Sequence, residues 1–143
     1  MREFNWQVRV YYEDTDSGGV VYYANYLRFM ERARTEWLRT LGVEQDTLSQ
    51  QEGLIFAVRS IQLEYVKPAK FNDLLDVSVA ISKTGKASLT FDQAISQAEG
   101  QKQLLCDGKV KIACLNCETF RPQAIPENIR RELTQEITGS IGR

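Results

Sequence analysis

Residues 23–42 read YANYLRFMERARTEWLRTLG, and this stretch decides the fold. Its apolar residues recur every three or four positions, which is the spacing of a helical face: Tyr23, Tyr26, Leu27, Met30, Ala33, Trp37, Leu38 and Leu41. Gly42 follows at once, and glycine commonly ends a helix. Because apolar groups cover much of its circumference, we expect a helix largely wrapped by protein. Its outward face is expected to carry Arg28, Glu31, Arg32, Arg34 and Glu36.

On both sides of this helix, apolar and polar residues alternate, which is the spacing of β-strands. One strand is expected over residues 4–12, before the helix. The other elements are expected after it: a short helix over 44–51, strands over 54–66, 74–82, 87–98 and 101–115, and an amphipathic helix from near Pro126. Residues 138–143 are expected to form a frayed tail.

One long apolar helix followed by consecutive antiparallel strands predicts an α+β fold, with a curled sheet wrapped around the helix. The length of 143 residues fits a single domain over residues 1–143. A curled open sheet leaves an edge strand, and a second copy of the chain would cover that edge by pairing with it. We therefore expect a homodimer or homotetramer.

Bulk composition excludes several classes of function. The formal net charge is −1 and the basic residues are scattered, whereas nucleic-acid binding needs a clustered positive surface. The N-terminal stretch has no apolar run long enough for a signal peptide or a membrane span. Cys114 and Cys117 form a CxxC pair, but a structural zinc needs four ligands. We expect a cytoplasmic protein without nucleic acid, membrane insertion, metal or other cofactor, in which the cysteines are buried or half-buried strand residues.

The sequence contains no histidine. Ser-His-Asp and Cys-His catalysis and histidine acid–base chemistry are therefore excluded. An enzyme with this sequence must move protons with carboxylates, lysine, tyrosine or bound water.

The connection from Asp14 to Val21 has an unusual composition for a simple loop. It holds two aspartates two positions apart, followed by Ser-Gly-Gly. Glycines let the backbone adopt unusual conformations and let a ligand approach closely. The helix expected to start near Tyr22 or Tyr23 offers unpaired backbone N–H groups, which can hold a polarised carbonyl oxygen. Carboxylate and N–H groups together would make a site for attack on a carbonyl.

Two other interpretations of this loop stay open at this point. Aspartates and glycines also cap helices and organise strand-to-helix turns, and composition alone favours that role. Calcium binding is less well supported. Asp14, Asp16 and Gly19 match positions one, three and six of an EF-hand loop. The ligands required at positions five and twelve of such a loop are missing.

A longer motif extends across the loop and the helix. Residues 8–39, VRVYYEDTDSGGVVYYANYLRFMERARTEWLR, resemble the signature of the 4-hydroxybenzoyl-CoA thioesterase family, and in particular its bacterial acyl-CoA thioesterases associated with the Tol-Pal envelope system. The similarity continues through EYVKPAKFNDLLDV, residues 64–77, to about Pro126. This resemblance implies the hotdog fold, in which a curled antiparallel sheet wraps a central helix and subunits pair through their sheets.

The resemblance also implies roles for individual residues. Asp16 corresponds to the family's catalytic aspartate, and the backbone N–H of Tyr23 to the group that polarises the thioester carbonyl. Most Tol-Pal-associated members have a histidine where this chain has Tyr23. Gly19 and Tyr22 are expected to contact the substrate, and Tyr22, Tyr23 and Phe56 to line an acyl pocket. Asp14 is expected to organise the loop.

Basic residues are expected where the phosphates of coenzyme A bind. Lys83 and Lys86 flank a predicted hairpin turn where relatives place basic residues against the nucleotide, and Lys86 falls on a family basic position. The alternative is that both are solvated turn lysines.

The function implied is hydrolysis of acyl-CoA to free CoA and a carboxylate, with Asp16 as nucleophile or general base. No cofactor is required, because a thioester is already activated. The alternative is a weakly active or non-catalytic hotdog protein that binds envelope or lipid-synthesis proteins. Contact with acyl carrier protein also remains open.

Overall fold

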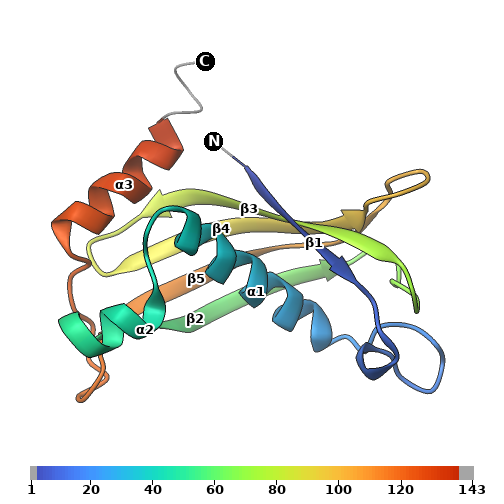
Figure 1. The fold of residues 1–143 in the computed structure, drawn as a ribbon, viewed down its shortest axis with the longest axis horizontal. Helices are drawn as coiled ribbons and strands as arrows, with labels where there is room; N and C mark the ends of the chain where they lie inside the picture. Colours follow the sequence, from blue (N-terminus) through green and yellow to red (C-terminus); the bar gives the residue numbers. More distant parts are fainter. Residues whose placement is uncertain (1–2, 139–143) are drawn as a thin grey trace.

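The computed structural model describes residues 3–138. Five strands form one sheet, with a long helix on one face and a second helix near one end (Figure 1). In chain order the elements are β1 (Phe4–Arg9), η1 (Tyr12–Asp14), α1 (Asn25–Thr40), α2 (Gln45–Thr47), η2 (Leu48–Glu52), β2 (Leu54–Tyr65), β3 (Leu74–Thr84), β4 (Ser88–Gln97), β5 (Leu104–Asn116) and α3 (Glu127–Thr138).

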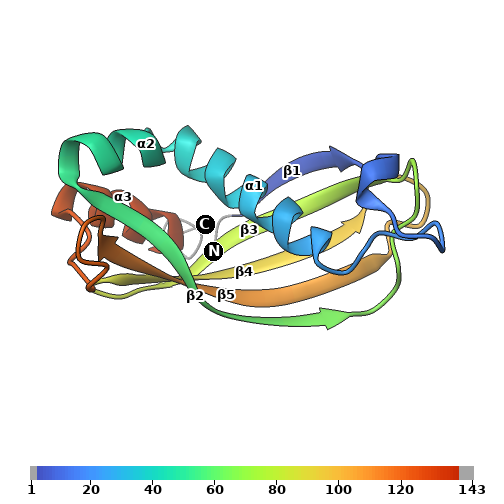
Figure 2. The same cartoon turned by 90° about the horizontal axis from the view of Figure 1, so that it is seen from below.

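The sheet is antiparallel throughout, and its strand order is β1-β3-β4-β5-β2. Seen from the side, it curves around α1, which lies on its inner face (Figure 2). Phe29, Met30 and Ala33 of the helix are buried against strand residues such as Phe91 and Ile95. The predicted α+β architecture, a curled sheet around a central helix, is therefore confirmed.

The predicted elements are present, with some ends displaced. The first strand ends at Arg9 rather than at Tyr12, because Tyr12–Asp14 form a 3₁₀ turn. The predicted helix over 44–51 consists of α2 and a short π-helical segment that ends at Gly53. Apart from Thr138, the predicted tail lies outside the described residues.

The prediction that Arg34 lies on the outward face of the central helix is wrong. Its side chain is buried between α1 and the sheet, where it donates to Oε1 of Gln93 at 2.9 Å. Gln93 in turn donates to the carbonyl oxygens of Met30 and Ser78. Arg34 lies one helical turn from both Met30 and Leu38, so it belongs to the stripe that faces the sheet. Burial lowers the pKa of the Arg34 guanidinium.

Gly108 lets β5 approach the edge strand β2 closely. It lies opposite Leu63, and a Cβ at this position would overlap both the Leu63 side chain and the Gln62 backbone oxygen. We expect Gly108→Ala to lower the free energy of unfolding by about 1–3 kcal/mol, as overpacking does. Urea denaturation measures this change. Gly85→Ala is the matched control, since its Cβ would meet mainly the movable Ser88 hydroxyl; equal stability of the two variants would contradict the prediction.

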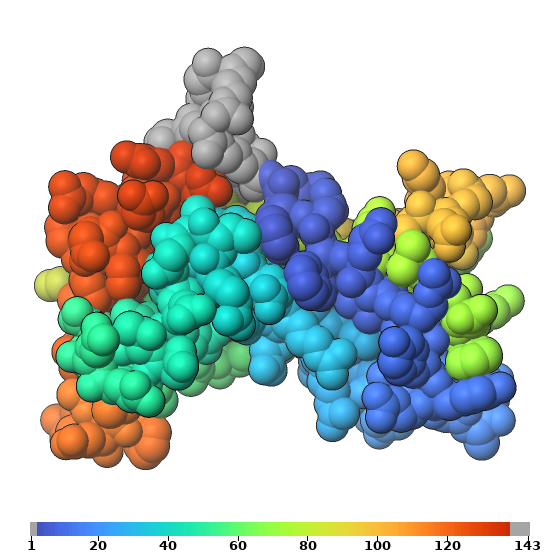
Figure 3. All heavy atoms as spheres, viewed as in Figure 1, coloured from blue at the N-terminus to red at the C-terminus, as the bar shows by residue number. Residues whose placement is uncertain are grey.

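The two ends of the molecule carry different segments (Figure 3). The segment leading into α1 forms one end, and α3 lies at the other. α3 packs through Leu133, which is fully buried, and Thr134 lies within hydrogen-bonding distance of Thr84 at the end of β3. No helix among residues 3–138 is long and apolar enough to cross a membrane.

Candidate active site

The loop between β1 and α1 is held against the segment that precedes β3. Val20 pairs with Lys70, and the Val21 N–H donates to the Ala69 carbonyl at 2.8 Å. Within the loop, Thr15 pairs with Val21, which closes the Asp16–Val20 turn. Backbone bonds on both flanks therefore fix the position of this turn.

Asp16 lies exposed at the start of the turn. Its Oδ1 accepts a hydrogen bond from the Gly18 N–H at 2.8 Å, and the described residues provide no partner for Oδ2. Gly18 permits this geometry because a Cβ there would lie 3.2 Å from the same oxygen. Gly19 has φ +79°, a conformation that favours glycine. The Ser-Gly-Gly sequence thus shapes a turn that leaves one carboxylate oxygen open to a reactant.

Asp14 has a structural role, as predicted. Its Oδ2 accepts from the Tyr11 N–H at 2.9 Å, and its carbonyl oxygen accepts from both the Tyr22 N–H and Nδ2 of Asn25. Asn25 is buried at the first position of α1, and it ties the helix to the loop. This role of Asn25 was not predicted from the sequence. Asn25 could have been recognised from the sequence, because it is a polar residue in the first turn of an otherwise apolar helix face.

Neither aspartate caps the central helix. α1 begins at Asn25, later than predicted, and its N-cap residue Ala24 makes no side-chain capping bond. The preceding turn is closed by the Asn25 N–H, which donates to the Tyr22 carbonyl at 2.8 Å. The Asp16 carboxylate bonds within its own loop instead. Asp16 therefore does not cap α1, and its bond to Gly18 organises the turn that precedes the helix.

The backbone N–H of Tyr23 lies in this turn. Within residues 3–138, no acceptor is hydrogen-bonded to it. The Tyr23 side chain is 62% exposed, so solvent and ligands can reach this part of the turn. An unpaired N–H on a fixed backbone is what an oxyanion-binding group requires. That it serves as one here stays a prediction.

Tyrosine rings form a wall beside this turn. The Tyr65 hydroxyl at the end of β2 donates to the Tyr23 carbonyl at 3.3 Å, and the Tyr65 ring lies edge-on to the rings of Tyr23 and Tyr26. The Tyr22 and Tyr23 ring centroids are 4.8 Å apart. Tyr65 could not be predicted from the sequence, because only the fold brings β2 to the start of α1. Phe56 does not join this wall: it lines a separate cavity of about 250 Å³ with Val58 and Leu38.

The cysteines lie on or next to β5, outside the Asp16 loop. Cys106 and Cys114 are buried on β5, and Cys117 is half-buried in the turn that follows. Burial, with a smaller contribution from Asp107, raises the pKa of Cys106 to about 11. Cys106 therefore carries a protonated thiol at neutral pH. It lies opposite Tyr65 in the β2–β5 pairing, but this position near the loop does not make it a nucleophile.

Lys83 and Lys86 do not lie beside Asp16 in the same chain. Leu74, at the start of β3, pairs with Arg9 near the loop, whereas Lys83 and Lys86 flank the far end of this strand. With 11 residues in β3, the ends are roughly 35 Å apart. The Lys86 carbonyl accepts from the Ile125 N–H just before α3. The predicted hairpin is confirmed, and within one chain it lies far from Asp16.

Comparison with known proteins relates this geometry to a family. The model of the thioesterase-like superfamily matches residues 10–133. The chain belongs to this superfamily. The thioesterase-like match thus includes the Asp16 turn, the central helix and the whole of β2–β5.

Individual thioesterase-like relatives match over most of their length. An acyl-CoA thioester hydrolase, YbgC, of Escherichia coli O6:H1 is 43% identical over 132 residues, which covers 92% of this chain and 96% of that protein. The acyl-CoA thioesterase YbgC of Haemophilus influenzae is 42% identical over 127 residues, covering 89% and 91%. The family resemblance inferred from residues 8–39 is confirmed.

The fold is confirmed by a solved structure. A mutant 4-hydroxybenzoyl CoA thioesterase complexed with 4-hydroxybenzoyl CoA superimposes with a TM-score of 0.84, covering 93% of this chain and 99% of that one. At 19% sequence identity, this likeness establishes the hotdog fold.

Proposed function

We propose that the protein is an acyl-CoA thioesterase that hydrolyses acyl-CoA to free CoA and a carboxylate. The observation that carries the proposal is the exposed Asp16 carboxylate on the same short loop as the Tyr23 N–H, which has no hydrogen-bond acceptor among residues 3–138. The identity of above 40% to acyl-CoA thioesterases, over most of both chains, supports acyl-CoA as the substrate.

In the proposed reaction the thioester carbonyl oxygen accepts a hydrogen bond from the Tyr23 N–H. This bond stabilises the negative charge that develops on the oxygen as the carbonyl carbon is attacked. Asp16 either removes a proton from the attacking water or attacks the carbon itself. In the second case an anhydride forms, and water then cleaves it. In both cases the carbon–sulfur bond breaks, and CoA leaves as a thiolate that takes up a proton.

We also propose that the chain forms a homodimer through β2. This 12-residue strand is the last of the sheet, and its apolar Val58 is 48% exposed. Antiparallel pairing of β2 with its copy would satisfy the free backbone groups and cover this side chain. It would also bring the partner's β3–β4 hairpin toward the end of the molecule where Asp16 lies. A further pairing of dimers would give a tetramer.

In such a dimer Lys83 and Lys86 contact the CoA phosphates of the partner's site. We expect Lys86→Ala to raise KM for an acyl-CoA about threefold to tenfold, because one exposed charge-assisted contact is lost. Steady-state kinetics measure this change. The control is the N-acetylcysteamine thioester of the same acyl group, which has no phosphates and should keep its KM. An unchanged KM for acyl-CoA would identify Lys86 as a solvated turn residue.

Activity itself is tested with purified protein and a panel of aliphatic and aromatic acyl-CoAs, by following thiol release. Turnover above background is the expected result. If none of the thioesters is hydrolysed, the proposal fails, and the alternative of a non-catalytic partner of envelope or lipid-synthesis proteins gains support. Acyl carrier protein thioesters, tested in parallel, would identify the preferred carrier.

A further inference from the structure

The backbone that carries Tyr65 is fixed beside the start of α1. Tyr65 is the last residue of β2, and the N–H groups of the next two residues both donate to the Leu105 carbonyl, at 2.8 and 3.1 Å. β2 ends at the same end of the molecule at which α1 starts (Figure 2). The sheet therefore delivers the Tyr65 side chain to the turn that contains Tyr23.

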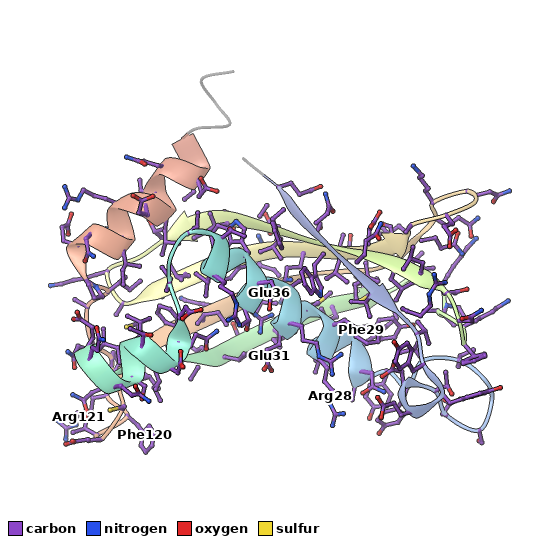
Figure 4. All side chains as sticks on the ribbon, viewed as in Figure 1. Arg28, Phe29, Glu31, Glu36, Phe120 and Arg121 are labelled. Carbon is purple, nitrogen blue, oxygen red and sulfur yellow. The ribbon has the colours of Figure 1, made fainter. Side chains whose placement is uncertain are left out.

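The Tyr65 ring leans on aromatic rings that are themselves fixed. Its centroid lies 5.4 Å from that of Tyr26, and the two rings meet edge-on. Tyr26 is buried, and its hydroxyl accepts from the Ala69 N–H at 3.0 Å. The Tyr26 ring in turn lies edge-on to Phe29, a fully buried residue of α1 that is labelled in Figure 4. Edge-to-face contacts of this kind have a preferred geometry, so they restrict where the Tyr65 hydroxyl can lie.

The Tyr65 hydroxyl and the backbone hold Tyr23 from both sides. The Tyr23 carbonyl accepts from the Tyr65 hydroxyl at 3.3 Å and from the Tyr26 N–H at 3.4 Å. The preceding carbonyl, that of Tyr22, accepts from the Asn25 N–H at 2.8 Å. Because a peptide group is planar, the Tyr22 carbonyl and the Tyr23 N–H point in linked directions. Tethers on both carbonyls therefore fix the conformation of Tyr23 and the direction of its N–H.

The position of Tyr65 suits a role in the site rather than in the core. Its side chain is 49% exposed, and it lies outside the cluster of buried residues. Burial of part of the side chain raises the pKa of the Tyr65 hydroxyl, so the group stays protonated and able to donate at neutral pH. An oxyanion donor is most effective when it is aimed before the charge develops, because it then needs no reorganisation during the reaction.

We propose that Tyr65 is a positioning residue for thioester hydrolysis. Through its hydrogen bond to the Tyr23 carbonyl, it keeps the Tyr23 N–H aimed at the thioester oxygen. The inference rests on the proposed function, because that N–H is the proposed oxyanion donor. Tyr65 acts through Tyr23 and makes no contact with the reacting atoms.

The variant Tyr65→Phe removes the hydroxyl and keeps the ring. We expect kcat for the acyl-CoA that is hydrolysed fastest to fall about threefold to tenfold, the size expected for one hydrogen bond between uncharged groups. KM should stay near the wild-type value, because the bond to the oxygen strengthens only as charge develops. The midpoint of thermal unfolding should also be unchanged. An unchanged kcat, or a loss of activity that follows a loss of folded protein, would overturn the proposal.

The double variant Tyr23→Pro/Tyr65→Phe tests whether Tyr65 acts through the Tyr23 N–H. Once proline has removed that N–H, removal of the Tyr65 hydroxyl should have almost no further effect on kcat. If the full factor persisted in the proline background, Tyr65 would act on the substrate directly, and the positioning role would be wrong.

Tyr12→Phe is the matched control for loss of an exposed tyrosine hydroxyl. Tyr12 is 75% exposed, and its ring is stacked on that of Phe71 at a centroid distance of 3.8 Å, a contact that phenylalanine preserves. This variant should keep the wild-type kcat. An equal fall in kcat in Tyr12→Phe and Tyr65→Phe would show that the effect is not specific to Tyr65, which contradicts the proposal.

A measurement without turnover separates this proposal from the proposed function. The chain has six tyrosines, so labelling with ¹⁵N-tyrosine gives six backbone amide signals, of which Tyr65→Phe removes one. The order parameter of the Tyr23 amide should fall from about 0.85 toward about 0.6 in Tyr65→Phe, while that of Tyr12 is unchanged. This result supports positioning even if no thioester is hydrolysed. An unchanged order parameter at Tyr23 refutes it even if hydrolysis is rapid.

Discussion

Asp16→Ala is expected to slow thioester hydrolysis by about 10²–10⁴-fold, the range that a positioned general base contributes. No histidine is present in the chain to replace the lost carboxylate. The fold should be unaffected, because Asp16 is exposed and its side chain bonds only to the Gly18 N–H among the described residues. Thiol release measures the rate, and thermal unfolding monitored by circular dichroism verifies the fold.

Asp16→Asn is the sharper control. The asparagine oxygen can still accept the hydrogen bond from the Gly18 N–H, so the turn is preserved while the charge is removed. Activity should fall as far as in Asp16→Ala. If Asp16→Asn retained most of the wild-type rate, Asp16 would be neither the nucleophile nor the general base. The proposed thioesterase activity would not be contradicted by that result.

Tyr23→Pro is expected to reduce kcat by about two to three orders of magnitude, the usual effect of losing one oxyanion-hole donor. Proline has no N–H, so this substitution deletes the proposed donor. The amide has no hydrogen-bond acceptor within residues 3–138, so no internal bond is lost. Proline is also tolerated just ahead of a helix, and α1 begins two residues later.

Tyr23→Phe is the matched variant, because it keeps the amide and the ring and removes only the hydroxyl. It should retain near-wild-type kcat. Single-turnover kinetics separate loss of the chemical step from loss of binding. If Tyr23→Phe lost as much activity as Tyr23→Pro, the side chain rather than the backbone would be the functional group, and the tyrosine would replace in function the histidine expected at this position.

Local patterns predicted most of the elements and missed several of their ends. The periods of 3.6 and 2 residues located α1 and all five strands because each element buries one face. The displaced ends depend on contacts with distant segments. α1 starts late because Tyr22 and Asn25 are bound to the Asp14 carbonyl.

Arg34 is a different kind of error. Charge suggested an outward position, but its place on the helix puts it on the stripe facing the sheet. There Gln93, 59 residues away in the chain, accepts its hydrogen bond. A pattern of apolar and polar residues does not reveal such a pair, because its polar members satisfy one another inside the core.

The sequence by itself determined the fold class, the absence of imidazole chemistry and the choice of Asp16 as the carboxylate to test, since composition, periodicity and a dense motif are all local properties. Only the tertiary structure decided which groups meet that loop. It brings Tyr65 to the Tyr23 turn and Phe71 to Tyr12, and it carries Lys86 to the far end of β3. The physical reason is that antiparallel pairing and sheet curvature set these distances, and they join residues that lie tens of positions apart in the chain.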